Sequence, residues 1–134
     1  DGDSRADTKA PGASDIAGLI SEARRSGFDI IVHGLEDLPT ESDELYQFTV
    51  YRVVQEILTN MLKHSRDKRG VLRFRSTGSG LVLSADNPAA RTPDNHEPGY
   101  GLIGMSERVR AYGGSVATRT EDGHFFITVE VPND

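Results

Sequence analysis

The chain has no cysteine among its 134 residues, and this absence excludes several kinds of site. Without thiols there is no disulfide scaffold, no thiolate zinc site and no cysteine nucleophile. Long apolar runs are also missing, so we expect no contact of this domain with a bilayer. The opening residues, DGDSRADTKAPGASD, lack the apolar core of a signal peptide. The lack of cysteine fits a reducing compartment, and we expect a cytoplasmic location.

An excess of positive charge is missing as well. The chain has 15 Lys and Arg against 21 Asp and Glu, a net charge of −6. A direct nucleic-acid binder needs a clustered positive surface, so this class is disfavoured. A nucleotide ligand stays compatible with the charge, because backbone N–H groups and a metal ion can hold phosphates.

The length and the balance of 36% hydrophobic and 27% charged residues are typical of one soluble globular domain. We expect residues 1–14 to be a disordered linker or a leftover cloning segment, and residues 15–134 to form the domain. Residues 14–27 have helical spacing, with Ser14 or Asp15 as the cap and Gly27 at the end. The β-branched residues of 28–34 predict a strand.

A long helix is predicted from about residue 41 to residue 64, with Thr40 or Ser42 as its cap. Its apolar stripe is wide, which indicates a largely buried helix. The stripe consists of Leu45, Phe48, Val50, Val53, Val54, Ile57, Leu58 and Met61.

Two hairpins and a third helix complete the expected fold. Strands 71–77 and 81–87 are joined through Gly78 and Gly80, and a helix runs from about 102 to 112. The Asp122-Gly123 pair then predicts the turn of the last hairpin. This order predicts an α/β sandwich, with a mixed sheet of about five strands and three helices on one face. Residues 88–100 show no periodic segment, which is typical of a functional lid.

Three polar positions follow one face of the long helix, within YRVVQEILTNMLKHS. Glu56, Asn60 and His64 are spaced i, i+4 and i+8, with Lys63 beside them. One interpretation is structural: Asn60 bonds within the core while Glu56 and Lys63 form a solvated pair. The other makes the Asn60 carbonyl oxygen a ligand for Mg²⁺, which prefers oxygen and takes the rest of its shell from water and phosphates. A zinc site at His64 is disfavoured, because no second ligand has suitable spacing.

A second candidate is LSADNP, at the end of a strand. The carboxylate of Asp86 can accept a hydrogen bond from an adenine amino group, whereas the alternative is ordinary Asp-Asn-Pro turn chemistry. The third candidate is the glycine cluster of EPGYGLIGMSER, with Gly99, Gly101 and Gly104. Glycines allow the backbone to approach an anion, and a helix start supplies N–H groups for phosphate oxygens. Neither a dinucleotide-binding fingerprint nor a Walker A motif fits this context.

The order of these three sites resembles the ATP-binding catalytic domain of two-component sensor histidine kinases, with the Bergerat-type fold. YRVVQEILTNMLKHS and GYGLIGMSERVRAYGG are similar to the N box and G2 box of the DesK-like subfamily, whose partners are NarL/LuxR-type response regulators. The resemblance covers roughly residues 15–133. It implies that the domain binds Mg²⁺ and ATP and donates the γ-phosphoryl group to a histidine of a separate dimerisation domain.

Carried over by position, the resemblance assigns Asn60 as the metal ligand and Glu56 as the acid facing the phosphoacceptor. Nucleotide contacts fall on Asn60, Lys63, His64, Asp86, Asn87, Gly99, Tyr100, Gly101, Leu102, Gly104 and Met105. The family usually has Asp-x-Gly where this chain has ADNPAA, so Ala85, Asp86 and Asn87 are alternative registers for the adenine contact.

The resemblance leaves two alternatives open. A phosphoacceptor motif around Glu-Leu-His-Asp is absent, so we expect little autophosphorylation by this chain alone. ADNPAA is also compatible with a catalytically degraded nucleotide-binding or interaction module of the same fold. The third reading is an anti-sigma-type serine kinase.

Overall fold

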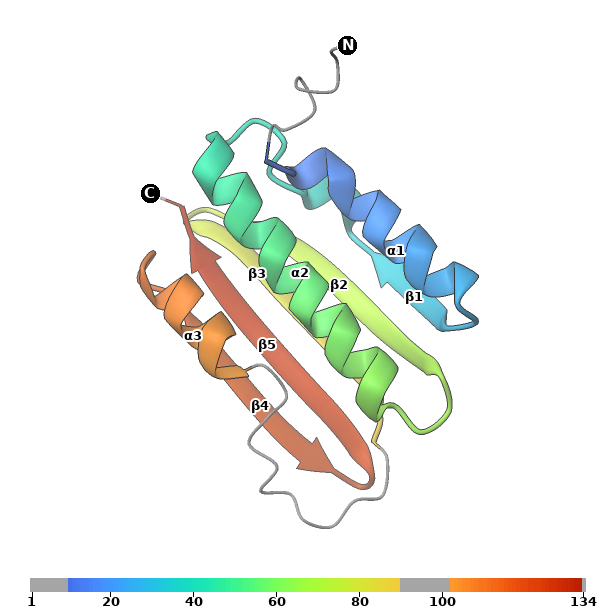
Figure 1. Cartoon of the computed structure of the whole chain (residues 1–134). Helices are drawn as coiled ribbons and strands as arrows, with labels where there is room; N and C mark the ends of the chain where they lie inside the picture. The colour runs from blue at the N-terminus through green and yellow to red at the C-terminus, as the bar shows by residue number, and fades with distance from the viewer. Residues whose placement is uncertain (1–9, 90–101, 134) are drawn as a thin grey trace.

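The computed structural model describes residues 10–89 and 102–133. Three α-helices lie on one face of a five-stranded sheet in this part of the chain (Figure 1). The elements are α1 (Ile16–Arg25), β1 (Asp29–His33), α2 (Glu44–His64), β2 (Arg69–Thr77), β3 (Gly80–Pro88), α3 (Leu102–Arg110), β4 (Ser115–Glu121) and β5 (His124–Pro132). The predicted α/β sandwich and the element order are confirmed.

The sheet is mixed and has the strand order β1-β2-β3-β5-β4. Strand β1 pairs in parallel with β2, and the other neighbours are antiparallel. A parallel neighbour requires a crossover, and α2 supplies it. The two antiparallel hairpins are β2–β3 and β4–β5, as the Gly78–Gly80 and Asp122-Gly123 turns predicted. Asp122 and Gly123 both have positive φ, at 50° and 76°, as this kind of hairpin turn requires.

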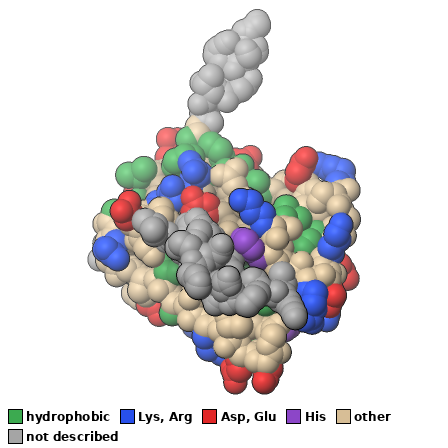
Figure 2. Space-filling model, turned by 60° about the horizontal axis from the view of Figure 1, so that its bottom comes forward, with side chains coloured by type: hydrophobic (Ala, Val, Ile, Leu, Met, Phe, Trp, Pro, Cys, Tyr) green, Lys and Arg blue, Asp and Glu red, His purple; other side chains and the backbone are tan. Residues whose placement is uncertain are grey.

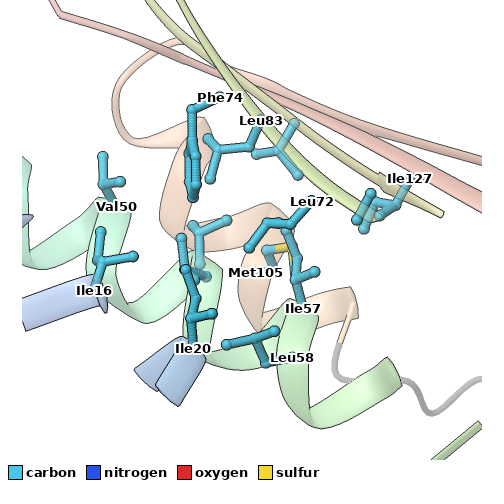
Figure 3. Close-up of a cluster of buried hydrophobic side chains, with 14 of the residues drawn as sticks. Ile16, Ile20, Val50, Ile57, Leu58, Leu72, Phe74, Leu83, Met105 and Ile127 are labelled. Atoms are coloured by element: carbon cyan, nitrogen blue, oxygen red, sulfur yellow. The ribbon is translucent and has the colours of Figure 1, made fainter. Parts of the chain in front are cut away.

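The hydrophobic core lies between the helices and the sheet (Figure 3). Side chains from all three helices meet alternate residues of the strands, because one face of each strand points toward the helices. The labelled set is Ile16, Ile20, Val50, Ile57, Leu58, Leu72, Phe74, Leu83, Met105 and Ile127. This packing fixes α2 and α3 against the same sheet, so polar residues on these two helices have defined positions.

The start of α2 differs from the prediction. Its cap is Asp43, whose carboxylate accepts a hydrogen bond from the Tyr46 backbone N–H at 2.9 Å, rather than Thr40 or Ser42. Leu45 is 67% exposed, although the apolar stripe was expected to include it, and Tyr46 is buried instead. The Tyr46 hydroxyl donates to the Val131 carbonyl, which explains how a polar tip fits inside the core.

Packing begins ahead of α1. Residues Ala13–Asp15 form a 3-10 turn, and Ala13 is 1% exposed. The Ala13 N–H donates to the side chain of Gln47 on α2 at 2.9 Å. Asp15 precedes α1 but its carboxylate accepts from the Gly12 N–H, at 2.8 Å. Residues 12–14 therefore contact the domain, although the sequence placed them in a linker.

Candidate functional site

Helix α2 presents a polar strip formed by Arg52, Glu56 and Asn60, which recur every four residues. The apolar residues of the same helix point into the core, so the strip lies on a neighbouring face and is only partly exposed. Oε2 of Glu56 is 2.8 Å from Nη1 of Arg108 on α3 and 3.7 Å from Nη2 of Arg52. The structural alternative paired Glu56 with Lys63, whereas the acid in fact binds two arginines.

Three atoms of this strip are buried without a hydrogen-bond partner among the described residues. They are Nε of Arg52, Oε1 of Glu56 and Nδ2 of Asn60. Buried polar atoms in native proteins are nearly always bonded, so atoms of this kind mark a place for water or a ligand. The orphan Nδ2 also argues against the structural interpretation, in which the Asn60 amide bonds within the core.

The residues present fit a Mg²⁺–nucleotide group. An amide oxygen such as Oδ1 of Asn60 is a hard ligand, and its orphan Nδ2 can donate to a phosphate oxygen. No group of three or more His, Asp or Glu side chains that could hold a metal occurs in residues 10–89 and 102–133.

Lys63 and His64 lie at the C-terminal end of α2. Lys63 is exposed and His64 is partly buried. Immediately after them the chain crosses to the end of β3: the Arg66 N–H donates to the Pro88 carbonyl at 2.8 Å, and Ser65 pairs with Ala89. Figure 2 views this end of the molecule, where Lys, Arg and His side chains are exposed beside Asp and Glu. The C-terminal part of α2, which carries Asn60, and the end of β3 therefore lie at the same end of the molecule.

The end of β3 settles which way its polar residues face. Ala85 and Asn87 are buried on the helix side, whereas Asp86 faces the uncovered side of the sheet. The Asp86 carboxylate binds Nη1 of Arg73 at 2.9 Å and Nε2 of His124 at 3.0 Å. Strand alternation thus turns the Asp86 side chain away from α2 and α3, and its predicted adenine contact stays a prediction.

Asn87 occupies the position that the helix-side register requires. It is 4% exposed, and its Nδ2 donates to the Pro88 carbonyl at 3.1 Å. Its partner in the sheet register is Phe125 of β5. Of the three alternatives left open by the sequence, Ala85 has no polar side chain, so Asn87 is the polar residue on the face toward α2.

The glycine cluster is described only in part. Gly99, Tyr100 and Gly101 lie outside the described residues, and Leu102 is the first residue of α3. A Cβ added to Gly104 would meet nothing within 4 Å, so packing does not require a glycine there. Because glycine in a helix costs about 1 kcal/mol relative to alanine, its presence calls for another reason. Met105 is fully buried in the core rather than displayed in an open site.

Two arginines that bind Glu56 were not predicted from the sequence. Arg52 and Arg108 both reach Glu56, and Arg108 is 52 positions away in the chain. The spacing of Arg52 and Glu56 at i, i+4 was a usable signal, since such pairs meet on a helix. The pairing with Arg108 depends on how α3 packs against α2, and no local pattern shows that.

Two cavities elsewhere in the molecule are not lined by residues of the strip. One of about 490 Å³ lies at the opposite end, beside Asp37, Thr40 and Tyr46. Another of about 320 Å³ lies on the uncovered sheet face, beside Asp86 and Phe126. Neither is lined by Asn60 or Asn87, so these two predicted residues mark a different part of the molecule. No described helix has the combination of length and apolar composition needed to cross a membrane.

Comparison with known proteins gives sequence relatives that are sensor kinases. The signal transduction histidine-protein kinase/phosphatase UhpB of Salmonella typhimurium is 34% identical over 85 residues, which is 63% of this chain and 17% of UhpB. The sensor histidine kinase ComP of Bacillus subtilis is 31% identical over 84 residues, which is 60% of this chain and 11% of ComP. The chain thus spans less than a fifth of either relative. No protein-family model matches it.

Solved structures share the fold. The catalytic domain of histidine kinase ThkA has a TM-score of 0.68 at 14% identity and covers 90% of both chains. The histidine kinase domain of a blue-light-activated kinase from Erythrobacter litoralis has a TM-score of 0.64 at 19% identity, over 88% of this chain and 57% of that one. At such identities these likenesses establish the architecture, and the sequence relatives agree with it.

Proposed function

We propose that the chain is the catalytic domain of a sensor histidine kinase, and that it binds ATP with Mg²⁺ for transfer of the γ-phosphoryl group to a histidine. The receiving histidine is on a separate dimerisation domain of the same kinase. The single observation that carries this proposal is the buried, unpartnered Nδ2 of Asn60 beside Glu56 on α2. An amide in this state has hydrogen-bonding capacity that the described part of the fold does not use.

Different residues are proposed to bind the metal ion and the phosphates. Oδ1 of Asn60 serves as the protein ligand for Mg²⁺, which supplies charge neutralisation at the phosphates when bound. The first backbone N–H groups of α3, from Leu102 through Met105, face no intrahelical acceptor and suit phosphate oxygens. Gly104 leaves open space beside this turn. Gly99, Tyr100 and Gly101 are proposed to complete the phosphate contacts, together with Lys63 and His64.

In this proposal Asn87 recognises the adenine base. Its bond to the Pro88 carbonyl uses Nδ2, so Oδ1 is the amide atom suited to accept from the adenine amino group. A neutral amide accepts such a bond less strongly than a carboxylate. We therefore expect weaker adenine binding than an acid at this position would give.

Chemistry in this class is mostly positioning and charge stabilisation. Glu56 lies one helical turn before Asn60, and its proposed role is to face the incoming imidazole. The chain alone is expected to bind nucleotide with little autophosphorylation. Downstream, we propose a NarL/LuxR-type response regulator as the receiver and a cytoplasmic location for this domain.

Isothermal titration of the folded chain with ATP, with and without Mg²⁺, tests the proposal. We expect saturable binding that strengthens when Mg²⁺ is present. If millimolar ATP with Mg²⁺ gives no binding while circular dichroism shows a folded domain, the proposal is wrong.

The alternative is a catalytically degraded nucleotide-binding or interaction module of the same fold, and the observation in its favour is ADNPAA in place of Asp-x-Gly. A folded chain that binds no ATP with Mg²⁺ would favour this alternative. A serine kinase of the same superfamily would bind nucleotide equally well, and the identity of the phosphorylated residue in the acceptor separates that reading from a histidine kinase.

A further inference from the structure

Phe125 lies beside Asn87 on the face of the sheet that the helices cover. The two residues are register partners on the neighbouring strands β5 and β3, and the Cβ atoms of such partners are about 5 Å apart. Strand alternation assigns the face, because Ile127 and Val129 follow Phe125 at every second position and are both in the core. Phe125 packs against this core and is half-buried. Part of its side chain therefore stays accessible from outside the core.

This pair of residues lies at the end of the sheet where α2 ends (Figure 1). The next partners in the register are Pro88 and His124. The Pro88 carbonyl accepts a hydrogen bond from the backbone of Arg66, two residues after α2. Asn60 is near the end of the same helix. Small-molecule pockets usually combine apolar or aromatic walls with a few polar groups that fix the orientation of the ligand. A half-buried ring beside a buried amide has this composition.

We propose that Phe125 is a specificity-determining residue on which the base of the nucleotide stacks, so that the site prefers purine over pyrimidine nucleoside triphosphates. The inference rests on the proposed function, because it concerns the base contact at Asn87. Stacking on an aromatic side chain tolerates different hydrogen-bonding groups, since every base has a π face. The two residues then select different properties of the base. Phe125 selects the larger ring system, and Asn87 selects the amino group.

Two other roles of the ring predict different behaviour. If Phe125 only closed the end of the core, its replacement by leucine would lower stability and leave nucleotide affinity unchanged. If the ring filled the base position and excluded the base, the same replacement would strengthen binding. Phe126 provides the internal comparison. It is also half-buried, but it faces the uncovered side of the sheet, where the Arg119 guanidinium lies 4.0 Å from its ring centroid.

Three variants test the proposal: Phe125→Leu, Phe125→Tyr and Asn87→Ala. Phe126→Leu is the matched control, because it makes the same change at the next position and on the opposite face. Titration calorimetry gives the Kd of each variant for ATP, ITP, CTP and inorganic triphosphate, all with Mg²⁺. ITP lacks the amino group, CTP has an amino group on a single ring, and triphosphate has no base. Proton NMR of bound ATP adds a direct measurement, because an aromatic ring shifts the protons of a stacked base upfield.

Phe125→Leu should weaken the binding of ATP and ITP by the same factor, roughly 5- to 50-fold, which is the loss of one base-stacking contact. Its Kd for inorganic triphosphate should change less than about twofold, since this ligand has no base to stack. CTP should lose less affinity than ATP, so the preference for ATP over CTP falls. Phe125→Tyr should retain the affinities and the upfield shift, because its ring also stacks. Asn87→Ala should instead lose the preference for ATP over ITP and keep the preference over CTP.

Four outcomes overturn the inference. Phe125→Leu could match Phe126→Leu in every Kd, it could strengthen ATP binding, it could weaken triphosphate binding as much as ATP binding, or it could keep the upfield shift. If Phe125→Leu does not fold, the NMR spectrum of ATP bound to the wild type decides, since adenine protons without an upfield shift contradict stacking. Failure of the proposed function looks different, because the folded wild-type chain would then bind neither ATP nor inorganic triphosphate.

Discussion

Asp86 and Asn87 are adjacent in sequence, yet their side chains lie on opposite faces of the sheet. One is an ion-paired carboxylate and the other is a buried neutral amide. On the uncovered face, the Asp86 carboxylate is bonded to Arg73 and His124. On the helix-covered face, Asn87 is buried and the strip on α2 holds three unpartnered polar atoms. The carboxylate on the uncovered face is thus already bonded, whereas the unpartnered atoms, from Arg52, Glu56 and Asn60, lie on the side of the sheet that the helices cover.

This contrast shows that charge alone does not mark a site. A carboxylate at a strand end suggests a functional site when only the sequence is known. In the fold, however, residues on neighbouring strands can already donate hydrogen bonds to its oxygens. An asparagine looks ordinary, although a buried amide without partners has capacity left for a ligand. The predictions below test the contrast, starting with the covered face.

The largest effect is expected for Asn60→Ala. Losing the proposed metal ligand should weaken Mg²⁺-dependent nucleotide binding by at least about 100-fold, since even residues that merely orient a ligand cost 10- to 100-fold. The fold should hardly change, because the removed Nδ2 has no partner among the described residues. Titration calorimetry measures the first effect, and a thermal melt should stay within about 4 °C. Normal phosphotransfer by this variant would contradict the metal-ligand role.

Tyr46, which is buried between the helices and the sheet, is expected to make the stability of the fold depend on pH. Burial raises the pKa of Tyr46 from its usual 10.0 to about 12. The folded state therefore keeps the proton that the unfolded state loses, so stability is complete below pH 10 and declines between pH 10 and pH 12. By pH 11 the loss is about 1.4 kcal/mol, from one unit above the unfolded pKa.

Urea denaturation at pH 8 and pH 11 measures this loss, with Tyr46→Phe as the control. The phenylalanine variant is less stable at pH 8, because the bond to the Val131 carbonyl is gone. Its additional loss at pH 11 should be smaller than that of the wild type by about 1.4 kcal/mol. Equal losses in both proteins would mean that Tyr46 is not the titrating group.

Much of the fold could be predicted from the sequence, because the signals are local. The period of the apolar residues gave the helices, and the Asp122-Gly123 pair gave the last hairpin. The Asn60 and Glu56 positions followed from helical spacing in the same way. These features depend on residues within a few positions of one another.

What could not be predicted depends on packing between distant segments. The face to which Asp86 points follows from the exact register of β3, and a shift of one residue reverses it. The cap at Asp43, rather than Thr40 or Ser42, and the burial of Tyr46 rather than Leu45 were likewise not predicted. The contact from Arg108 to Glu56 joins two helices whose approach is set by the sheet beneath them.

A smaller effect is expected at Asn87, where a base contact can be isolated. Asn87→Ala should weaken ATP binding about tenfold, the equivalent of one hydrogen bond of about 1.4 kcal/mol. ITP has an oxygen in place of the adenine amino group, so the wild type should prefer ATP and Asn87→Ala should not. Asn87→Asp should retain the preference for ATP, since a carboxylate also accepts. A preference for ATP that survives in the alanine variant would assign base recognition to another residue.

The smallest effect is expected for Asp86→Asn, on the uncovered face. Arg73 is 47% exposed, so the ion pair is screened by solvent and its removal should cost at most about 1 kcal/mol in urea denaturation. The affinity for Mg²⁺·ATP should change less than about twofold, because the altered side chain faces away from α2 and α3. A drop in affinity as large as that of Asn87→Ala would place the base contact at Asp86. The nucleotide base would then bind on the uncovered face of the sheet.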